Sequence, residues 1–126
     1  MTGPQRILVC DDDPLLVELV EFRLSSKGYA VDVARDGAET LARLSESRPD
    51  AVVLDAMMPI MDGYEVLRRM REQDALAEIP VIMLTARKQE RDIVGALELG
   101  ASDFMVKPFM PEELVARLAR LLAESK

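Results

Sequence analysis

The sequence predicts an α/β fold in which a doubly wound, five-stranded parallel sheet is covered by five helices. Short, largely apolar runs alternate with longer segments whose apolar residues recur at helical spacing. A strand that helices cover on both faces is apolar throughout, whereas a half-solvated hairpin strand alternates between apolar and polar residues. The expected strands cover residues 6–10, 30–34, 51–54, 80–84 and 103–106.

Length and composition fit a single domain. The chain has 126 residues, 49% of them hydrophobic, which is enough for one core of ordinary size. No apolar run reaches the ~20 residues that a membrane span needs, and residues 1–6 lack the apolar segment of a signal peptide. We therefore expect one cytoplasmic domain over residues 1–126, with its core at about 6–124 and no contact with a membrane.

Charge and residue types exclude several functions. A formal net charge of -7 argues against direct binding to nucleic acid. The chain has no histidine, which excludes Ser-His and Cys-His catalysis and histidine-ligated zinc. Its one cysteine, Cys10, lies in an apolar run and is expected to be a small buried side chain. Carboxylates must then do any chemistry, and they favour Mg²⁺, with Mn²⁺ as the alternative.

The first strand, residues 6–10, ends on three acids that precede a helix. Asp13 can cap that helix, and Pro14 suits its first turn. Asp11 and Asp12 have no such task, and clustered like charges cost free energy unless a cation lies nearby. Both are therefore candidate site residues, with a solvated acidic turn as the alternative.

The central apolar run, residues 51–54, stops abruptly on one carboxylate, Asp55. In open α/β sheets, ligands bind outside the carboxyl ends of the strands, where the strand order reverses. Asp55 is thus a candidate functional residue, and a solvated turn residue is the alternative. Asp62 is expected to cap the next helix, which would begin at Gly63. We expect the methionines of the intervening loop to fill space beside the site.

The remaining units repeat this pattern. Asp36–Gly37 is expected to open the helix after the second strand. The fourth strand leads to Thr85, and the helix after it is expected from about Lys88 to Leu99. The fifth strand ends on Lys107, and the last helix should start at Pro111. No linker, repeat or domain boundary interrupts the five units.

Candidate site residues thus follow four of the five expected strands. Parallel strands joined by right-handed crossovers bring all their carboxyl ends to one edge of the sheet. In the flavodoxin-like order 2-1-3-4-5, the first and third strands are neighbours, so Asp11, Asp12 and Asp55 could surround one cation. Asp55 could then attack a phosphorus atom while the cation, Lys107 and the Thr85 hydroxyl stabilise the phosphoryl oxygens. The predicted product is an aspartyl phosphate.

From about Arg6 to Glu124 the chain resembles the receiver domains of bacterial two-component response regulators. Any one of the motifs that carry this resemblance is weak, but their order and spacing are specific. They are Asp11-Asp12, Leu54-Asp55 through Met58-Pro59 to Asp62-Gly63, Thr85-Ala86, and Gly100-Ala101 leading to Lys107-Pro108-Phe109.

The resemblance implies a phosphoacceptor, a metal site and a cation that contacts the phosphoryl group. Asp55 would be the phosphoacceptor. Mg²⁺ would be bound by Asp12, by Asp55 and by the backbone carbonyl of Met57, with Asp11 acting largely through water. Lys107 would contact the phosphoryl group, and its bond to Pro108 would be cis.

The resemblance also implies a switch. Thr85 and Phe104 would transmit the state of Asp55 to the face built from the fourth helix, the fifth strand and the fifth helix. The donor would be a partner histidine kinase, a phosphotransfer protein or a small phosphodonor. Such a domain catalyses its own phosphorylation and dephosphorylation but has no independent turnover substrate. We further expect Met57 and Arg87 to shield the phosphoryl group from water.

Two other functions remain as alternatives. One is a phosphorylation-independent receiver that serves only as an interaction module. The other is a haloacid-dehalogenase-like, Mg²⁺-dependent phosphatase with an aspartate nucleophile. Such phosphatases typically carry a second acid two residues after the nucleophile, where this chain has Met57.

A homodimer that depends on phosphorylation, or an attached effector domain, is the further partner that the resemblance suggests. Receivers attached to winged-helix domains form dimers through charged pairs. Asp103 and Arg117 match one such pair. Ile93, Ser102 and Ala119 stand where other charges would be expected.

Overall fold

The computed structural model describes residues 3–86 and 90–124. It contains one five-stranded sheet whose neighbouring strands are all parallel, in the order β2-β1-β3-β4-β5. The predicted fold class and strand order are therefore confirmed. The strands are β1 (Arg6–Cys10), β2 (Ala30–Ala34), β3 (Ala51–Asp55), β4 (Val81–Thr85) and β5 (Asp103–Val106).

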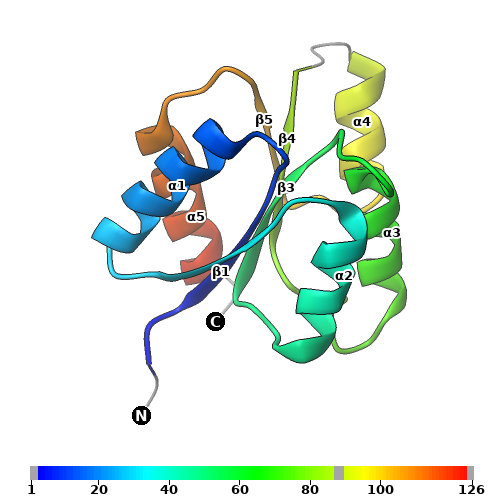
Figure 1. Ribbon diagram of the computed structural model, residues 1–126. Helices are drawn as coiled ribbons and strands as arrows, with labels where there is room; N and C mark the ends of the chain where they lie inside the picture. Colours follow the sequence, from blue (N-terminus) through cyan, green and yellow to red (C-terminus); the bar gives the residue numbers. More distant parts are fainter. Residues whose placement is uncertain (1–2, 87–89, 125–126) are drawn as a thin grey trace.

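Five helices alternate with the strands and cover both faces of the sheet. One face carries α1 and α5, which lie side by side, and the other carries α2, α3 and α4 (Figure 1). None of the helices in the described ranges is long and apolar enough to cross a membrane. The helices are α1 (Pro14–Ser26), α2 (Gly37–Glu46), α3 (Gly63–Glu72), α4 (Glu90–Glu98) and α5 (Pro111–Glu124).

Aspartates fix where three of the helices begin. The Asp13 carboxylate accepts the backbone N–H groups of Leu15 and Leu16 at 3.0 and 3.3 Å. Asp36 and Asp62 cap α2 and α3 in the same way. A helix start leaves its first N–H groups without intrahelical partners, and an aspartate side chain satisfies them. The predicted caps at Asp13 and Asp62 are confirmed, and Asp36 caps the helix that Asp36–Gly37 was expected to open.

The sheet divides the core into two layers. Alternate side chains of a strand point to opposite faces, so Ile7 and Val9 pack against α1 and α5, whereas Leu8 and Cys10 pack against α2 and α3. All five residues of β3 are buried, as are all five of β4. Cys10 is a free thiol that is fully buried, as expected, and burial raises its pKa to about 12.

Element boundaries differ slightly from the prediction. The strands β3 and β4 extend to Asp55 and Thr85, so both polar residues belong to the strand rather than to the loop after it. Within α2, the polar residue Thr40 is buried together with Gly37 and Leu44, and its hydroxyl donates to the carbonyl oxygen of Asp36 at 2.8 Å. The expected start of the fourth helix, Lys88, lies outside the described residues.

Candidate functional site

Three carboxylates meet at the carboxyl edge of the sheet. Asp11 and Asp12 follow β1, and Asp55 ends the neighbouring strand β3. One oxygen from each lies within 4.8 Å of the others. Asp11 is fully buried, Asp55 is 5% exposed and Asp12 faces solvent. The structure thus brings together the three acids that the sequence marked as a group.

Lys107 places a cation in this cluster. Its ammonium lies 2.8 Å from Oδ2 of Asp11 and 3.3 Å from Oδ1 of Asp55. The backbone N–H of Lys107 donates to the Thr85 carbonyl at 2.7 Å, which ties the loop after β5 to the end of β4. The Lys107-Pro108 peptide bond is cis, as expected.

The electrostatics of the cluster show incomplete charge compensation. Burial, and next the negative charge of Asp11, raise the pKa of Asp55 from 3.8 to about 6, although Lys107 acts in the opposite direction. Burial lowers the pKa of Lys107, but its hydrogen bond to Asp11 and the two nearby carboxylates outweigh this, so that pKa lies above its ordinary value. At neutral pH Asp55 is therefore ionised, in surroundings that disfavour its negative charge.

These carboxylates fit a divalent cation. Asp11, Asp12 and Asp55 carry three negative charges when ionised, whereas Lys107 supplies one positive charge. Carboxylate oxygens are the ligands that Mg²⁺ prefers, and a cation among them would offset the repulsion that raises the pKa of Asp55. The donor set therefore agrees with the predicted metal.

The backbone holds the acids in place. One Asp11 oxygen accepts the backbone N–H of Asp13 at 3.0 Å, and the other accepts a hydrogen bond from the Lys107 ammonium. Asp11 therefore links the loop after β1 to Lys107. The N–H of Met57 approaches Oδ1 of Asp55 at 3.4 Å. The Met57 side chain is 51% exposed, at the rim of the site rather than in the core.

Thr85 and Phe104 lie on the strands beside Asp55. Thr85 is fully buried and follows Leu84, the partner of Asp55 in the sheet. Phe104 pairs with Met83 on the other side of β4 and packs, half-buried, against the core layer beneath α3 and α4. Thr85 thus lies on β4, the strand next to that of Asp55, and Phe104 lies on β5, the strand after β4. Arg87, expected to shield the site, lies outside the described residues.

Two glycines were missed as site residues. A Cβ atom on Gly63 would lie 2.2 Å from the carbonyl oxygen of Asp55, and one on Gly37 would lie 2.2 Å from that of Met61. Only glycine at position 63 therefore allows α3 to start so close to the end of β3. In the same way, only glycine at position 37 allows α2 to pack so closely against the loop between β3 and α3. Both glycines follow a capping aspartate, and that Asp-Gly pairing was the available signal.

Asp103 and Arg117 pair within this one chain. Arg117 donates to Oδ1 of Asp103 at 2.9 Å and to Glu113 at 2.8 Å. Asp103 also accepts its neighbour's backbone N–H, from Phe104, at 2.7 Å. This network joins α5 to β5 without a second subunit.

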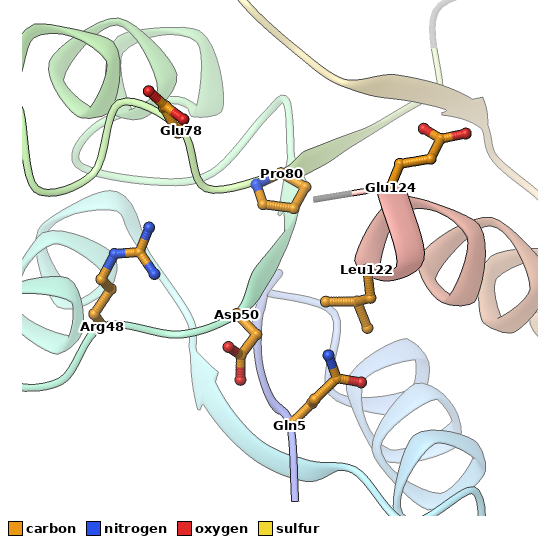
Figure 2. Close-up of a pocket in the computed structure, with 7 residues that line it drawn as sticks. All are labelled: Gln5, Arg48, Asp50, Glu78, Pro80, Leu122 and Glu124. Atoms are coloured by element: carbon orange, nitrogen blue, oxygen red, sulfur yellow. The ribbon is translucent and has the colours of Figure 1, made fainter. Parts of the chain in front are cut away.

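Hollows occur at both edges of the sheet. One of about 240 Å³ lies between α1 and the loop before α5, and its lining includes Asp13 but none of the three clustered acids. A larger one, of about 430 Å³, opens at the opposite, amino edge (Figure 2). Its lining comes from the start of β1, the segments before β3 and β4, and the end of α5: Gln5, Arg48, Asp50, Glu78, Pro80, Leu122 and Glu124. The larger hollow is thus remote from the clustered acids.

Comparisons with known proteins agree with this geometry. A family model described as the response regulator receiver domain matches residues 7–119. The transcriptional regulatory protein TrcR of Mycobacterium tuberculosis is 48% identical over 123 residues, which are 98% of this chain and 47% of that protein. The chain spans about half the length of the curated relatives it matches.

Solved structures show the same fold. A putative response regulator from Chloroflexus aurantiacus superposes with a TM-score of 0.91 at 36% identity, covering 96% of this chain and 99% of that one. The receiver domain of sensor histidine kinase PA1611 from Pseudomonas aeruginosa, which has a magnesium ion in its active site cleft, gives 0.88 at 33% identity, covering 96% and 99%. The chain therefore belongs to the family of response regulator receiver domains.

Proposed function

We propose that Asp55 receives a phosphoryl group and that the chain acts as a phosphorylation switch. The observation that carries this proposal is the cluster of Asp11, Asp12 and Asp55 around the Lys107 ammonium at the carboxyl edge of the sheet. Asp11 and Asp55 are both buried and both contact Lys107, but the two oxygens of Asp11 are engaged by the Asp13 N–H and by Lys107. The contacts of Asp55 with Lys107 and with the Met57 N–H both fall on Oδ1.

The residues support a phosphoryl transfer in which the protein positions charges. A carboxylate oxygen of Asp55 forms a bond to phosphorus as the bond to the donor's leaving group breaks. Lys107, 3.3 Å from Asp55, can move its ammonium onto a phosphoryl oxygen, and the Thr85 hydroxyl can follow. Mg²⁺ held by Asp12, Asp55 and the Met57 carbonyl, with Asp11 through water, would supply positive charge to the phosphoryl oxygens. The chain catalyses its own phosphorylation and dephosphorylation, without a separate turnover substrate.

The expected output is a change on the face formed by α4, β5 and α5. A phosphoryl group on Asp55 would draw the Thr85 hydroxyl inward and leave space for Phe104, whose strand joins β4 directly. Packed elements shift between discrete arrangements, so such a movement can alter a distant face.

This function requires a phosphodonor outside the chain, because the chain has no histidine to carry phosphate itself. A histidine kinase or a phosphotransfer protein would be the partner that supplies it, and a small phosphodonor is the alternative. Several curated relatives are named as regulators of transcription or response regulators and are about twice as long as this chain. We propose that the switch acts through an effector domain or a homodimer.

Intact-protein mass spectrometry with acetyl phosphate tests the phosphoacceptor. Wild-type protein incubated with acetyl phosphate and Mg²⁺ should gain one phosphoryl group, and Asp55→Asn should gain none. Asp50→Asn, at the opposite edge of the sheet, is the matched control and should behave as wild type. An equal adduct on wild type and Asp55→Asn would overturn the assignment.

A magnesium titration followed by amide chemical shifts tests the metal site. Asp12→Ala should weaken binding by about tenfold or more, because a carboxylate ligand is lost, while the dispersed spectrum shows that the protein remains folded. Asp12 is exposed and contributes little to the core. Unchanged affinity in Asp12→Ala would exclude Asp12 as a ligand.

A further inference from the structure

The methionines are divided unevenly between the core and the surface. The chain has eight methionines and one cysteine. Within residues 3–86 and 90–124, Met57 is 51% exposed and Met110 is 71% exposed. The other methionines in these ranges are buried or partly buried: Met58, Met61, Met70, Met83 and Met105. Oxidation of a thioether follows its exposure, so an oxidant that meets the folded protein should reach Met57 and Met110 first.

The cysteine does not compete for the oxidant. Cys10 is fully buried in β1, and burial raises its pKa to about 12. The thiolate is the form of cysteine that reacts, and it is scarcely populated at neutral pH when the pKa is so high. Reversible oxidation of the folded chain therefore falls on its exposed thioethers.

The backbone holds Met57 beside the phosphoacceptor. The Met57 N–H approaches Oδ1 of Asp55 at 3.4 Å. Ala56, which lies between them in the chain, donates its N–H to the carbonyl oxygen of Leu84 at 2.8 Å and accepts the N–H of Gly63 at 2.9 Å. The Met57 side chain thus extends into solvent from a backbone that β4 and the start of α3 fix next to Asp55.

Met110 provides a contrast at the same edge of the sheet. It lies in the loop after β5, which Figure 1 shows at the same edge as the loop after β3. Its carbonyl oxygen accepts the N–H groups of Glu113 and Leu114 at 2.9 and 3.4 Å, so its backbone is tied to the first turn of α5. Of the two exposed methionines, Met57 is therefore the one whose backbone contacts Asp55.

We propose that Met57 is a reversible oxidation site and that its sulfoxide shortens the lifetime of phosphorylated Asp55. This inference rests on the proposed function. It adds an input to the switch: the redox state of one side chain at the rim sets how long the phosphoryl group stays on the protein.

Hydrogen peroxide is the oxidant in this step. A lone pair of the Met57 sulfur attacks one peroxide oxygen, and an S–O bond forms as the O–O bond breaks. The departing hydroxide takes up a proton and leaves as water, so sulfur is oxidised and peroxide is reduced. Methionine sulfoxide reductases reverse the change, with a dithiol that becomes a disulfide as reductant and water as the other product.

The sulfoxide changes what the rim offers to water. A thioether sulfur is a weak hydrogen-bond acceptor, whereas the sulfoxide is polar and its oxygen accepts hydrogen bonds. In hydrolysis, a water oxygen bonds to phosphorus, the bond from phosphorus to the Asp55 oxygen breaks with its electron pair returning to the carboxylate, and the water proton passes to solvent. A sulfoxide oxygen at the rim accepts a hydrogen bond from the attacking water and orients it.

Leucine substitutions separate the two exposed methionines. Leucine has nearly the volume of methionine but contains no sulfur to oxidise. Wild type, Met57→Leu and Met110→Leu are treated with hydrogen peroxide, which catalase then removes, and peptide mass spectrometry locates the sulfoxides. Treated and untreated samples are phosphorylated with acetyl phosphate and Mg²⁺, the donor is removed, and the loss of phosphate is followed. Each variant is compared with its own untreated form.

Peroxide should place sulfoxide on Met57 and Met110 of wild type and shorten the lifetime of the phosphorylated protein about threefold to tenfold. Met110→Leu should show the same shortening. The treated and untreated forms of Met57→Leu should agree within about 1.5-fold. Methionine sulfoxide reductases with a dithiol should restore the lifetime of treated wild type.

An unchanged or longer lifetime in wild type that carries the Met57 sulfoxide would overturn the inference. Shortening that persists in Met57→Leu would also overturn it, because another residue would then respond to peroxide. So would peroxide treatment that leaves Met57 unoxidised while buried methionines react. Failure of the proposed function would look different, since untreated wild type would then gain no phosphate on Asp55.

Discussion

The carboxylates at the two edges of the sheet have different surroundings: they bond singly to the backbone at the amino edge and cluster around one ammonium at the carboxyl edge. At the amino edge, Asp50 accepts the backbone N–H of Arg6 at 2.7 Å, and the Arg48 guanidinium donates to the Ala75 carbonyl at 2.9 Å. Each of these two charged side chains thus forms a hydrogen bond with a different backbone group, and both line an open hollow (Figure 2). Such hydrogen bonds each stabilise a fold by about 1 kcal/mol.

At the carboxyl edge the acids are forced together. Asp11 is fully buried and Asp55 nearly so, and both contact the ammonium of Lys107. Burial and the negative charge of Asp11 raise the pKa of Asp55. The hollow between α1 and the loop before α5, whose lining includes Asp13 but neither of these two acids, is smaller than the one at the amino edge. Incompletely compensated charge, rather than the size of a cavity, thus marks the reactive end of this sheet.

Removal of Lys107 should produce the largest effect on stability. Lys107→Met leaves buried Asp11 without its cation, and breaking a buried ion pair costs about 3 kcal/mol or more of unfolding free energy. Urea titration at pH 7.5 without divalent cations measures this loss. At the amino edge, Arg48→Met should cost less than about 1 kcal/mol, since one exposed hydrogen bond is removed. Similar losses at both edges would contradict the comparison.

Neutralising Asp55 should increase the unfolding free energy, whereas removal of Lys107 should decrease it. The folded protein holds a proton on Asp55 up to a pH of about 6, whereas the unfolded chain loses it near 3.8. The stability contribution of Asp55 therefore falls as pH rises from about 4 to about 6. Asp55→Asn should raise the unfolding free energy by about 2 kcal/mol at pH 7.5 without divalent cations.

The pH profile provides the control for that prediction. The gain in Asp55→Asn should disappear below about pH 4, where Asp55 is protonated in both states. Asp50→Ala at the amino edge should instead lose about 1 kcal/mol, because the Arg6 N–H loses its acceptor. A destabilised Asp55→Asn at neutral pH would show that the carboxylate is not electrostatically strained.

Sequence patterns predict the strands and the converging polar residues well, because both follow from local rules. Apolar runs set the strands, aspartates set the helix starts, and parallel connections bring the strand ends to one edge. The distances could not be predicted in this way. The direct ion pair of Lys107 with Asp11, 96 residues apart, depends on the tertiary placement of both loops.

Other features escaped prediction for the same reason. In the sequence, Ile60 is an ordinary apolar loop residue, but its φ is 73° in the structure. The loop around it packs closely against two other elements, at Gly37 and at Gly63, and such tertiary contacts are not visible in the sequence. Thr40 interrupts the apolar face of α2 but is buried, since its hydroxyl bonds to the backbone one turn earlier. Asp103 and Arg117 were considered for contacts between subunits, yet within the chain they contact each other.

A smaller, conformational effect is expected for Thr85. Thr85→Ala should still accept phosphate, because Asp55 and Lys107 remain. When beryllofluoride, a mimic of the phosphoryl group, is added, the chemical shifts around Phe104 should change much less than in wild type. A full wild-type response in Thr85→Ala would refute a coupling through that hydroxyl.

The smallest effect is expected at the rim. Hydrolysis needs a water in line with the phosphorus–oxygen bond, and the half-exposed Met57 side chain can shield that position without orienting a water. Met57→Asn should therefore shorten the lifetime of phosphorylated protein about threefold to tenfold, as followed by loss of label from purified protein. An unchanged lifetime would show that Met57 does not control access.

The position of the phosphoryl group in the chain tests whether Asp55 is the phosphoacceptor. After phosphorylation by acetyl phosphate with Mg²⁺, borohydride reduction converts an aspartyl phosphate to homoserine, which tandem mass spectrometry locates in the chain. We expect homoserine at Asp55, with Asp11, Asp12 and Asp50 unmodified. Homoserine at any of those three acids with Asp55 intact would contradict the account.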